Sequence, residues 1–340
     1  MSRRLPAEWE PQSGILLSLP HAGTDWQPYL DEALNFYRDL IAAIVRHEKV
    51  LLVCPDAAEA KKWLEGEGVK MERVIFAELP ANDTWARDFG LITVEENGQP
   101  LMLDYEFNGW GLKFAANFDN QINSRLYAQG LLGKRPMQKP GWILEGGSIE
   151  SDGQGTILTT TTCLLSDNRH PHKDRADIEA RIKRELGATR VLWLQNGHLE
   201  NDDTDAHVDT LARFCDAETI AYVGCGDKND HHYEGLQAMK RELQAFMQAN
   251  GKPYRLIELP MVDPLFFDGE RLPATYANFL ILNDAVIAPV YGVASDIAAL
   301  EALKTAFPKH KIVPLDASVL VRQHGSIHCV TMQIPASVAL

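Results

Sequence analysis

The amino-acid sequence predicts an α/β protein, and two observations support that prediction. Segments whose apolar residues recur every three or four positions alternate along the chain with short runs rich in β-branched and aromatic residues. This alternation is typical of proteins that pack helices against sheets. No linker rich in proline or serine and no low-complexity tract interrupts the 340 residues, so we expect one domain over residues 1–340.

The predicted elements follow one another in a regular order. The helices are expected at 29–47, 117–131, 173–187, 233–250 and 294–307, with the clearest apolar faces in the first and fourth. The strands are expected at 50–54, 74–77, 157–162, 191–194, 221–223, 256–259, 286–290 and 330–334. Five long helices in a chain of 340 residues suggest a fivefold structural repeat that has diverged beyond sequence identity.

Composition and charge exclude several classes of protein. Apolar residues make up 45% of the chain and charged residues 24%, which is ordinary for a globular protein and excludes a disordered one. Acidic residues outnumber basic residues by 47 to 33, so the formal charge of −14 disfavours nucleic acid and anionic membranes and favours a cationic ligand. No apolar stretch reaches the roughly 20 residues of a membrane helix. Five scattered cysteines without a CxxC pair indicate a reducing, cytoplasmic location.

Polar residues gather in four segments that lie beside predicted strands. These segments are NDTWARDFG (82–90), LEGGS (144–148), DTDAHVD (203–209) and GSIHC (325–329). In the third segment, His207 and Asp209 would share one face if Val208 lay in a strand. A histidine with carboxylate neighbours can transfer protons near neutral pH. The alternative is a hydrogen-bonded strand end at the surface.

The same segment also has a metal interpretation. Asp205, His207 and Asp209 are ligands suited to manganese, and DAHVD resembles the DAHxD motif of the arginase and agmatinase ureohydrolases. The GGDHS-like and SxDxDxxDP-like segments of that family are missing from the chain. We therefore predict that the protein holds no metal at this motif, and we expect no cofactor.

Cys329 is the cysteine with the surroundings of a nucleophile. It follows glycine, serine and histidine at the start of a predicted strand, and His207 is the residue that could act as its base. We expect this thiol alone to be accessible and thiolate-like. The other cysteines are expected to be small buried hydrophobes: Cys54, Cys163, Cys215 and Cys225.

Carboxylates and an aromatic ring in the first two segments could hold a planar cation. Asp83 and Asp88 flank Trp85, and Glu145 precedes two glycines that permit close backbone approach. Surface turns are the ordinary explanation of such strings. Six histidines show no ligand spacing and are expected to be solvated or structural: His170, His172, His198, His231, His232 and His324.

Taken in order, the segments resemble the agmatine deiminases, also known as the bacterial peptidylarginine deiminase family. The matching strings are NDTWARDFG, LEGGSIE, DDTDAHVDTLARF and GSIHCVTMQIP, preceded by LPAEWEPQSGILLSLP near the N-terminus. Together they cover residues from about 5 to about 335. The resemblance implies the pentein fold, in which five ββαβ-type units form a propeller around a central active-site channel. Each unit would deliver one side chain to the centre, and Asn278 could mark the unit between His207 and Cys329.

The resemblance also implies a role for each residue of the site. Cys329 would be the nucleophile and His207 the general acid and base. Asp88 and Asp209 would hold the guanidinium nitrogens, while Glu145 would orient His207 and help to hold the substrate. The reaction implied is hydrolysis of agmatine to N-carbamoylputrescine and ammonia through a covalent thiouronium on the cysteine.

The residues expected around the rest of the substrate are less closely matched to the family. Trp85 would line the channel, and Asp203 and Asp205 in the acidic loop would attract the cationic tail of agmatine. The chain has Ala206 where the family usually has glycine, and Arg-Gln-His at 322–324 where members tend to have a glycine run. These departures concern the loops that contact the far end of the substrate.

Several alternatives stay open from the sequence. The protein could be a deiminase of free or peptidyl arginine, a manganese ureohydrolase that releases urea, or a non-catalytic pentein that serves as a binding module. Arg87 and Arg213 lie near the motifs, but we expect them to pair with neighbouring carboxylates rather than with a substrate carboxylate. The expected partner is a small cationic guanidine, with no nucleic acid and no membrane. A homo-oligomer is compatible with the sequence.

Overall fold

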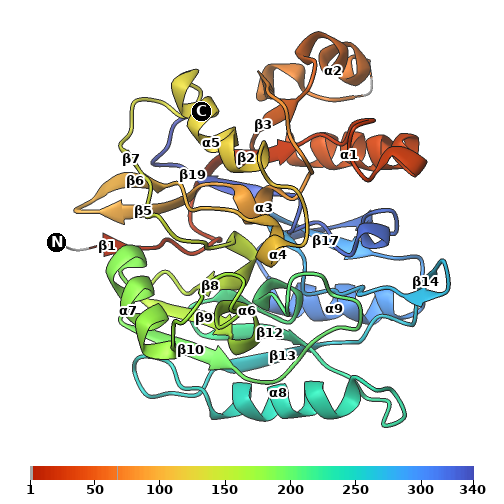
Figure 1. The fold of residues 1–340 in the computed structure, drawn as a ribbon. Helices are drawn as coiled ribbons and strands as arrows, with labels where there is room; N and C mark the ends of the chain where they lie inside the picture. The colour runs from red at the N-terminus through yellow and green to blue at the C-terminus, as the bar shows by residue number, and fades with distance from the viewer. Residues whose placement is uncertain (1–2, 67) are drawn as a thin grey trace.

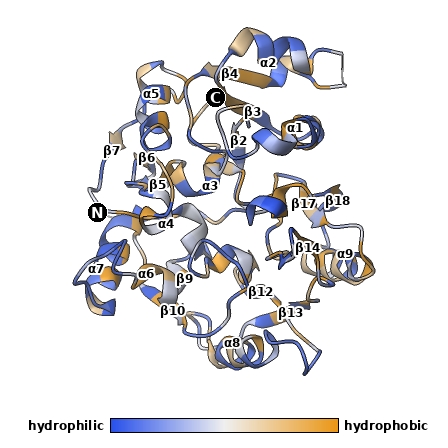
Figure 2. Ribbon diagram, turned by 45° about the vertical axis from the view of Figure 1, so that its right-hand side comes forward, coloured by the Kyte–Doolittle hydropathy of each residue, from blue (hydrophilic) through white to orange (hydrophobic). Residues whose placement is uncertain are grey.

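The computed structural model describes residues 3–66 and 68–340, which form a mixed α/β structure (Figure 1). The long helices lie around the outside of the strands: α1 (Leu30–Ile44), α7 (Arg175–Leu186), α8 (Tyr233–Ala245) and α9 (Ser295–Ala306). These helices carry both hydrophilic and hydrophobic residues, so that one face can be buried while the other is solvated (Figure 2). None of the helices in the described residues is long and apolar enough to cross a membrane.

Most strands of the described residues belong to five sheets. Two sheets have four strands. The first has the order β19 (Met332–Pro335), β2 (Gln12–Ser18), β3 (Lys49–Cys54), β4 (Val74–Glu78). The second has the order β1 (Arg3–Arg4), β5 (Ile92–Glu96), β6 (Gln99–Leu103), β7 (Met137–Gln138). Three sheets have three strands, in the orders β10 (Arg190–Leu194), β9 (Thr156–Thr160), β8 (Ile149–Ser151); β11 (Ala212–Asp216), β12 (Thr219–Val223), β13 (Arg255–Leu259); and β16 (Leu280–Ile281), β17 (Ala285–Val290), β18 (Lys311–Asp316). A separate hairpin joins β14 (Phe266–Phe267) to β15 (Glu270–Arg271).

The five sheets share one pairing pattern. Each contains an antiparallel pair next to a parallel pair, as in β8–β9 followed by β9–β10. Parallel neighbours need a crossover connection, and in each sheet a helix lies on the chain between the parallel strands. These helices are α1, α5 (Ile122–Ala128), α7, α8 and α9. The five sheets are therefore units of similar construction.

All five predicted helices are present, although their ends differ from the prediction. The second is the shortest, because residues Asp119–Gln121 form a 3-10 turn before α5 begins. The strand predicted at 157–162 ends at Thr160, whose hydroxyl accepts a hydrogen bond from the Cys163 amide and caps the short helix α6 (Thr161–Leu164). The sequence pattern did not reveal α2 (Ala57–Leu64) or the short helices α3 (Ala86–Phe89) and α4 (Gly109–Leu112).

The core lies between the helices and the sheets. On α1 the apolar stripe includes Phe36, Leu40 and Ile44, all buried. The central strand β3 reads as the continuous apolar run VLLVC after its first residue, and all of that run is buried. This is the expected pattern for a strand that pairs in parallel and is covered on both faces.

Candidate active site

Five polar side chains from distant segments lie together in the interior. They are Asp88, Glu145, His207, Asp209 and Cys329, each at most 4% exposed. Polar groups are rarely buried in such density without a functional reason, because each must lose its water. Their proximity joins the four segments that the sequence pattern singled out.

Gly147 shows how closely the groups approach one another. A Cβ atom added at this glycine would meet three of them: His207 Nδ1 at 2.7 Å, Asp88 Oδ1 at 2.8 Å and Asp209 Oδ2 at 3.1 Å. The preceding residue, Gly146, packs against the backbone of Arg87, where a Cβ would lie 2.2 Å from the carbonyl oxygen. The two glycines of the EGG string therefore permit the close backbone approach that the sequence suggested.

The sheets explain why these residues meet. A polar residue of the site lies two to four residues before one strand of the antiparallel pair in each sheet. Asp88 precedes β5, Glu145 precedes β8, Asp209 precedes β11, Asn278 precedes β16 and Cys329 precedes β19. Asn278 binds two of the others, because it donates from Nδ2 to Asp209 Oδ2 at 3.2 Å and accepts at Oδ1 from the Cys329 amide at 3.1 Å.

One backbone conformation considered from the sequence and one predicted from it are not found in the structure. Val208 begins the 3-10 turn Val208–Thr210 and does not lie in a strand, so His207 and Asp209 do not share a face by strand alternation. Cys329 lies in a turn before β19 and not at the start of the strand. Both side chains are placed by turns, where the chain changes direction. The alternation of side chains along a strand does not determine where they point.

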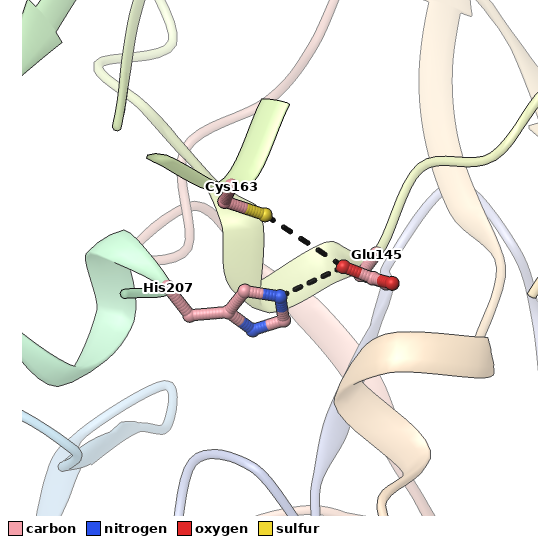
Figure 3. Close-up of side chains that lie close together, drawn as sticks. All are labelled: Glu145, Cys163 and His207. Atoms are coloured by element: carbon pink, nitrogen blue, oxygen red, sulfur yellow. Dashed lines mark hydrogen bonds and ion pairs between the residues drawn. The ribbon is translucent and has the colours of Figure 1, made fainter. Parts of the chain in front are cut away.

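Glu145 is held by three neighbours in a fully buried cluster. Its Oε2 lies 2.8 Å from His207 Nε2 and 3.8 Å from Cys163 Sγ, as Figure 3 shows. Arg169 Nε donates to both carboxylate oxygens, at 2.9 and 2.8 Å. Burial alone would raise the pKa of Glu145, but His207 and Arg169 together hold it below its usual value. The carboxylate is therefore ionised and fixes one nitrogen of His207.

Cys163 was expected to be only a small buried hydrophobe, and that prediction is incomplete. It is buried, but its thiol lies against Glu145 in the cluster of Figure 3. No pattern in the sequence indicated this contact, since Cys163 lies outside the four polar segments.

His207 is poised to be protonated in the free protein. Burial would lower its pKa, but the charge of Asp88 and the hydrogen bond with Glu145 raise the pKa of His207 well above its usual value. Its Nδ1 has no hydrogen-bond partner, and the nearest carboxylate oxygen, Asp88 Oδ1, is 3.5 Å away. An imidazolium with one free nitrogen can donate a proton to a bound ligand.

The two aspartates are oriented by different partners. Asp88 accepts from Trp110 Nε1 at 2.8 Å and from the Gly147 amide at 3.0 Å, and burial raises its pKa to about 6. Asp209 Oδ2 lies 2.7 Å from His328 Nδ1, and this contact helps to lower the pKa of Asp209 despite its burial. Asp209 Oδ1 has no hydrogen-bond partner. Unpartnered buried atoms on His207 and Asp209 indicate a site that binds a polar ligand, with a donor for the Asp209 oxygen.

Beneath the aspartates lies a network of buried charges. Glu8, from the N-terminal segment, contacts Arg87 at 2.9 Å, Arg213 at 2.6 Å and His328 Nε2 at 2.8 Å. Arg213 also pairs with Glu150. The prediction that both arginines are partners of carboxylates is confirmed, and neither lies free to bind a substrate carboxylate.

Cys329 differs from the prediction of an accessible thiolate. It is buried like the other four cysteines. Burial, and then the charges of Asp209 and Asp88, raise the pKa of Cys329 well above its usual value. Its Sγ lies 3.7 Å from Asp209 Oδ2. In the free protein the sulfur is therefore a thiol, and a cation placed between the aspartates would favour its ionisation.

A cavity leads to this cluster and is acidic. Its lining residues are Asp25, Asp83, Trp85, Asp88, Trp110, Phe114, Asp203, Thr204, Thr210, Gln323, His324, Gly325 and Cys329. The lining that the structure describes thus contains four aspartates and no lysine or arginine. Gly325 makes room for Trp85, because a Cβ there would lie 2.1 Å from the indole ring.

Two residues predicted from the sequence lie elsewhere than expected. Asp205 does not line the cavity, because its carboxylate pairs with Arg169 at 2.6 Å and with Lys113 at 2.8 Å. His324, which was expected to be solvated or structural, does line the cavity and lies 2.7 Å from Asp203 Oδ2. The sequence could have indicated His324 only through its place one residue before the GSIHC string.

Comparisons with known proteins agree with this geometry. Residues 4–335 match the model of the family described as Porphyromonas-type peptidyl-arginine deiminase. An agmatine deiminase of Medicago truncatula is 33% identical over 363 residues, which cover 98% of this chain and 96% of the relative. The chain belongs to the Porphyromonas-type peptidyl-arginine deiminase family.

Solved structures of the family superpose closely on this protein. A Porphyromonas gingivalis protein, described as a candidate arginine deiminase, is 45% identical with a TM-score of 0.95, covering 99% of this chain and all of that one. A cysteine-to-serine variant of the C. jejuni agmatine deiminase with substrate bound is 41% identical with a TM-score of 0.91, covering 98% of this chain and 96% of that one. The mixed α/β fold is therefore that of the agmatine deiminases.

Because the chain belongs to the deiminase family, the DAHVD string is not the metal-binding motif of a ureohydrolase. Asp205 pairs with Arg169 and Lys113, and Asp209 with His328, so the three side chains of the motif do not form a shared metal site among the described residues. The resemblance of this short string to the ureohydrolase motif is accidental.

One departure from the family pattern has a structural explanation. Ala206 adopts φ = 63°, in the left-handed region that favours glycine. Its amide donates to Asp202 Oδ2 at 2.6 Å, and Asp202 Oδ1 accepts from the Thr204 hydroxyl at 2.7 Å. These hydrogen bonds hold the strained turn that places His207 in the site.

Replacing Arg169 with glutamine tests the charge balance at Glu145. We expect the free energy of unfolding to fall by about 3 kcal/mol or more, because the change leaves a buried carboxylate without its cation. Arg175→Gln is the matched control, since Arg175 pairs with Glu179 at the surface and should contribute less than about 1 kcal/mol. Urea denaturation of both variants measures the difference. Equal, small losses would show that Arg169 does not compensate Glu145.

Proposed function

We propose that this protein hydrolyses the guanidinium group of agmatine to N-carbamoylputrescine and ammonia. The observation that best supports this function is the convergence of Asp88, Glu145 and Asp209 around His207 and Cys329. Three buried carboxylates around the sulfur of Cys329 suit a planar cation whose carbon is to be attacked. The names of the relatives point to the same substrate.

The carboxylates would place the guanidinium carbon near the sulfur. Asp88 and Asp209 would accept hydrogen bonds from the guanidinium nitrogens, and the cation would offset the negative charges that keep Cys329 protonated. Binding would therefore promote the thiolate, which is the reactive form of cysteine. Fixing the two reactants in contact removes much of the entropic cost of attack.

The chemistry then needs one acid and one base. The thiolate of Cys329 attacks the guanidinium carbon and forms a tetrahedral adduct. His207, which is protonated in the free protein, donates its proton to the departing nitrogen of this adduct. Ammonia leaves, and a covalent thiouronium on Cys329 remains. The neutral imidazole then takes a proton from water, which attacks the same carbon. Collapse of the second adduct releases the ureido product and restores the thiolate.

The remaining features of the site support this assignment. Glu145, held by Arg169, keeps His207 oriented and stabilises its charged form. Trp85 and Trp110 would enclose the aliphatic stem of the substrate. We further propose that the five sheets are the units of a pentein propeller around this site in one domain over residues 1–340, since each sheet presents one polar residue there.

The acidic cavity favours agmatine over arginine. Its described lining offers carboxylates to an ammonium tail, whereas the carboxylate of arginine would lie among Asp25, Asp83 and Asp203. An unpaired, desolvated carboxylate costs on the order of 2–4 kcal/mol. We therefore expect kcat/KM for agmatine to exceed that for arginine by at least roughly tenfold.

The test is a comparison of agmatine, arginine and an arginyl peptide with the purified protein at one pH, with and without EDTA. Ammonia and the ureido product are measured together with urea. We expect ammonia from agmatine and the same rate in EDTA. Release of urea would contradict the deiminase reaction. Equal or higher kcat/KM for arginine would contradict the substrate assignment, and no turnover of any guanidine would leave only a binding function.

A further inference from the structure

His324 occupies an unusual place in the backbone of the cavity wall. Its φ of 66° lies in the left-handed region, which is unfavourable for a residue with a side chain and open to glycine. The next residue, Gly325, packs against Trp85. Backbone strain next to a site suggests that the side chain at the strained position serves that site.

The side chain of His324 forms an ion pair inside the cavity. Nδ1 lies 2.7 Å from Asp203 Oδ2, and the two side chains are 27% and 42% exposed. Both residues line the cavity that leads to Cys329. Their position at the lining, away from the buried cluster, makes them available to the part of a substrate that extends from the guanidinium.

The charges around His324 come from several elements, and most are negative. The close contact with the Asp203 carboxylate raises the pKa of His324, and Asp202 and Glu270 of β15 act in the same direction. Across the cavity the described lining adds Asp25, Asp83 and Asp88. His324 is therefore the group of this lining that can become positive.

The neighbouring cations are already engaged by other groups. Lys113 donates to the Asp203 carbonyl at 2.6 Å and to Asp205 at 2.8 Å. Arg322 pairs with Glu32 at 2.9 Å. Among the described residues, His324 is thus the cationic group that contacts the carboxylate of Asp203.

We propose that the His324–Asp203 pair is the element of this site that sets its affinity for an ammonium tail. When His324 is protonated, it neutralises Asp203 and the cavity attracts a cationic tail weakly. When His324 is neutral, Asp203 is free to pair with the tail. This inference rests on the proposed deiminase function and adds a specificity-determining pair to it.

The sign of the pH dependence follows from this competition. Below the pKa of His324 the ion pair is formed, and above that pKa Asp203 is released. The preference for a tail that carries an ammonium should therefore increase as pH rises through the raised pKa of His324. The amine of agmatine stays protonated over this pH range. The change in preference must therefore come from a group of the protein.

The test compares agmatine with butylguanidine, which is agmatine without its amine. Both compounds share the guanidine chemistry, so the ratio of their kcat/KM values cancels the titrations of Cys329 and His207. We expect this ratio to rise at least roughly fivefold between about pH 5.5 and about pH 8.5. Purified full-length protein is used throughout.

Three variants identify the groups responsible. His324→Gly relaxes the backbone and should give a ratio that is high and independent of pH. Asp203→Asn should give a ratio that is low and independent of pH. His231→Asn is the control, because His231 also pairs with a carboxylate, Glu200, but does not line the cavity, and it should keep the wild-type slope.

Each outcome bears on a definite claim. A ratio that does not change with pH in the wild type, with agmatine still turned over, would overturn the pair's role and leave the deiminase function standing. A slope that survives in His324→Gly would also overturn it. Absence of ammonia from both guanidines would overturn the proposed function, and the inference with it.

Discussion

Replacing Cys329 with serine is expected to lower kcat by at least about a thousandfold while the protein stays folded. A hydroxyl has almost no deprotonated population near neutral pH, and a guanidinium between Asp88 and Asp209 cannot supply the missing acidity. Serine differs from cysteine only by oxygen in place of sulfur, so the change in volume at the buried position of Cys329 is small. The thermal unfolding temperature should therefore move little. Ammonia release under saturating agmatine measures the effect.

Cys225→Ser is the matched control for this variant. Cys225 is also buried, but its sulfur contacts the Asp227 carbonyl away from the cavity, so its loss should leave turnover unchanged. Cys163 would be a poor control, because it lies against Glu145. If Cys329→Ser kept even a tenth of the wild-type rate in an uncontaminated preparation, the covalent mechanism would be wrong.

Replacing Gly147 with alanine is expected to reduce kcat/KM by at least about a hundredfold. The new methyl group would lie less than a van der Waals contact from His207 Nδ1, Asp88 Oδ1 and Asp209 Oδ2. Something must move, and every one of these atoms belongs to the proposed machinery. The backbone of Gly147 has no positive φ, so alanine can adopt its conformation without strain of its own.

Gly226→Ala separates this effect from the general cost of changing a glycine. Gly226 also lacks a positive φ, and a Cβ there meets no atom within 4 Å, so its activity should match the wild type. Circular dichroism and thermal unfolding of both variants check that they fold. Activity of Gly147→Ala within threefold of the wild type would show that the three polar groups do not act at the position that the structure gives them.

Local patterns in the sequence were sufficient for much of the fold. The helix predicted at 233–250, which spans Tyr233–Ala245, follows from the spacing of its apolar residues, because periodicity reports which face is buried. The strand at 50–54 follows from its continuous apolar run, which suits a strand covered on both faces. Short elements were missed, as with α3, because four residues give no period to recognise. The turn at Val208–Thr210 was not predicted, since hydrogen bonding within a turn leaves no periodic signal.

The motifs identified the polar residues of the site but not the groups that support them. Arg169, Trp110 and His328 hold Glu145, Asp88 and Asp209, and none was assigned a role from sequence. The same is true of His324 at Asp203. A buried charge can be balanced by any partner that the fold brings near, and separation along the chain does not indicate which one.

The sequence by itself determined the alternation of helices and strands, the acidic character of the chain and the order of motifs that shows its family. Only the tertiary structure decided that Cys329 is a buried thiol, that Asp205 serves Arg169, and that His324 lies in the cavity. The physical reason is the range of the interactions. Periodicity and turn preference act between residues close in the chain, whereas burial, pKa and charge pairing depend on neighbours that only the packed fold brings together.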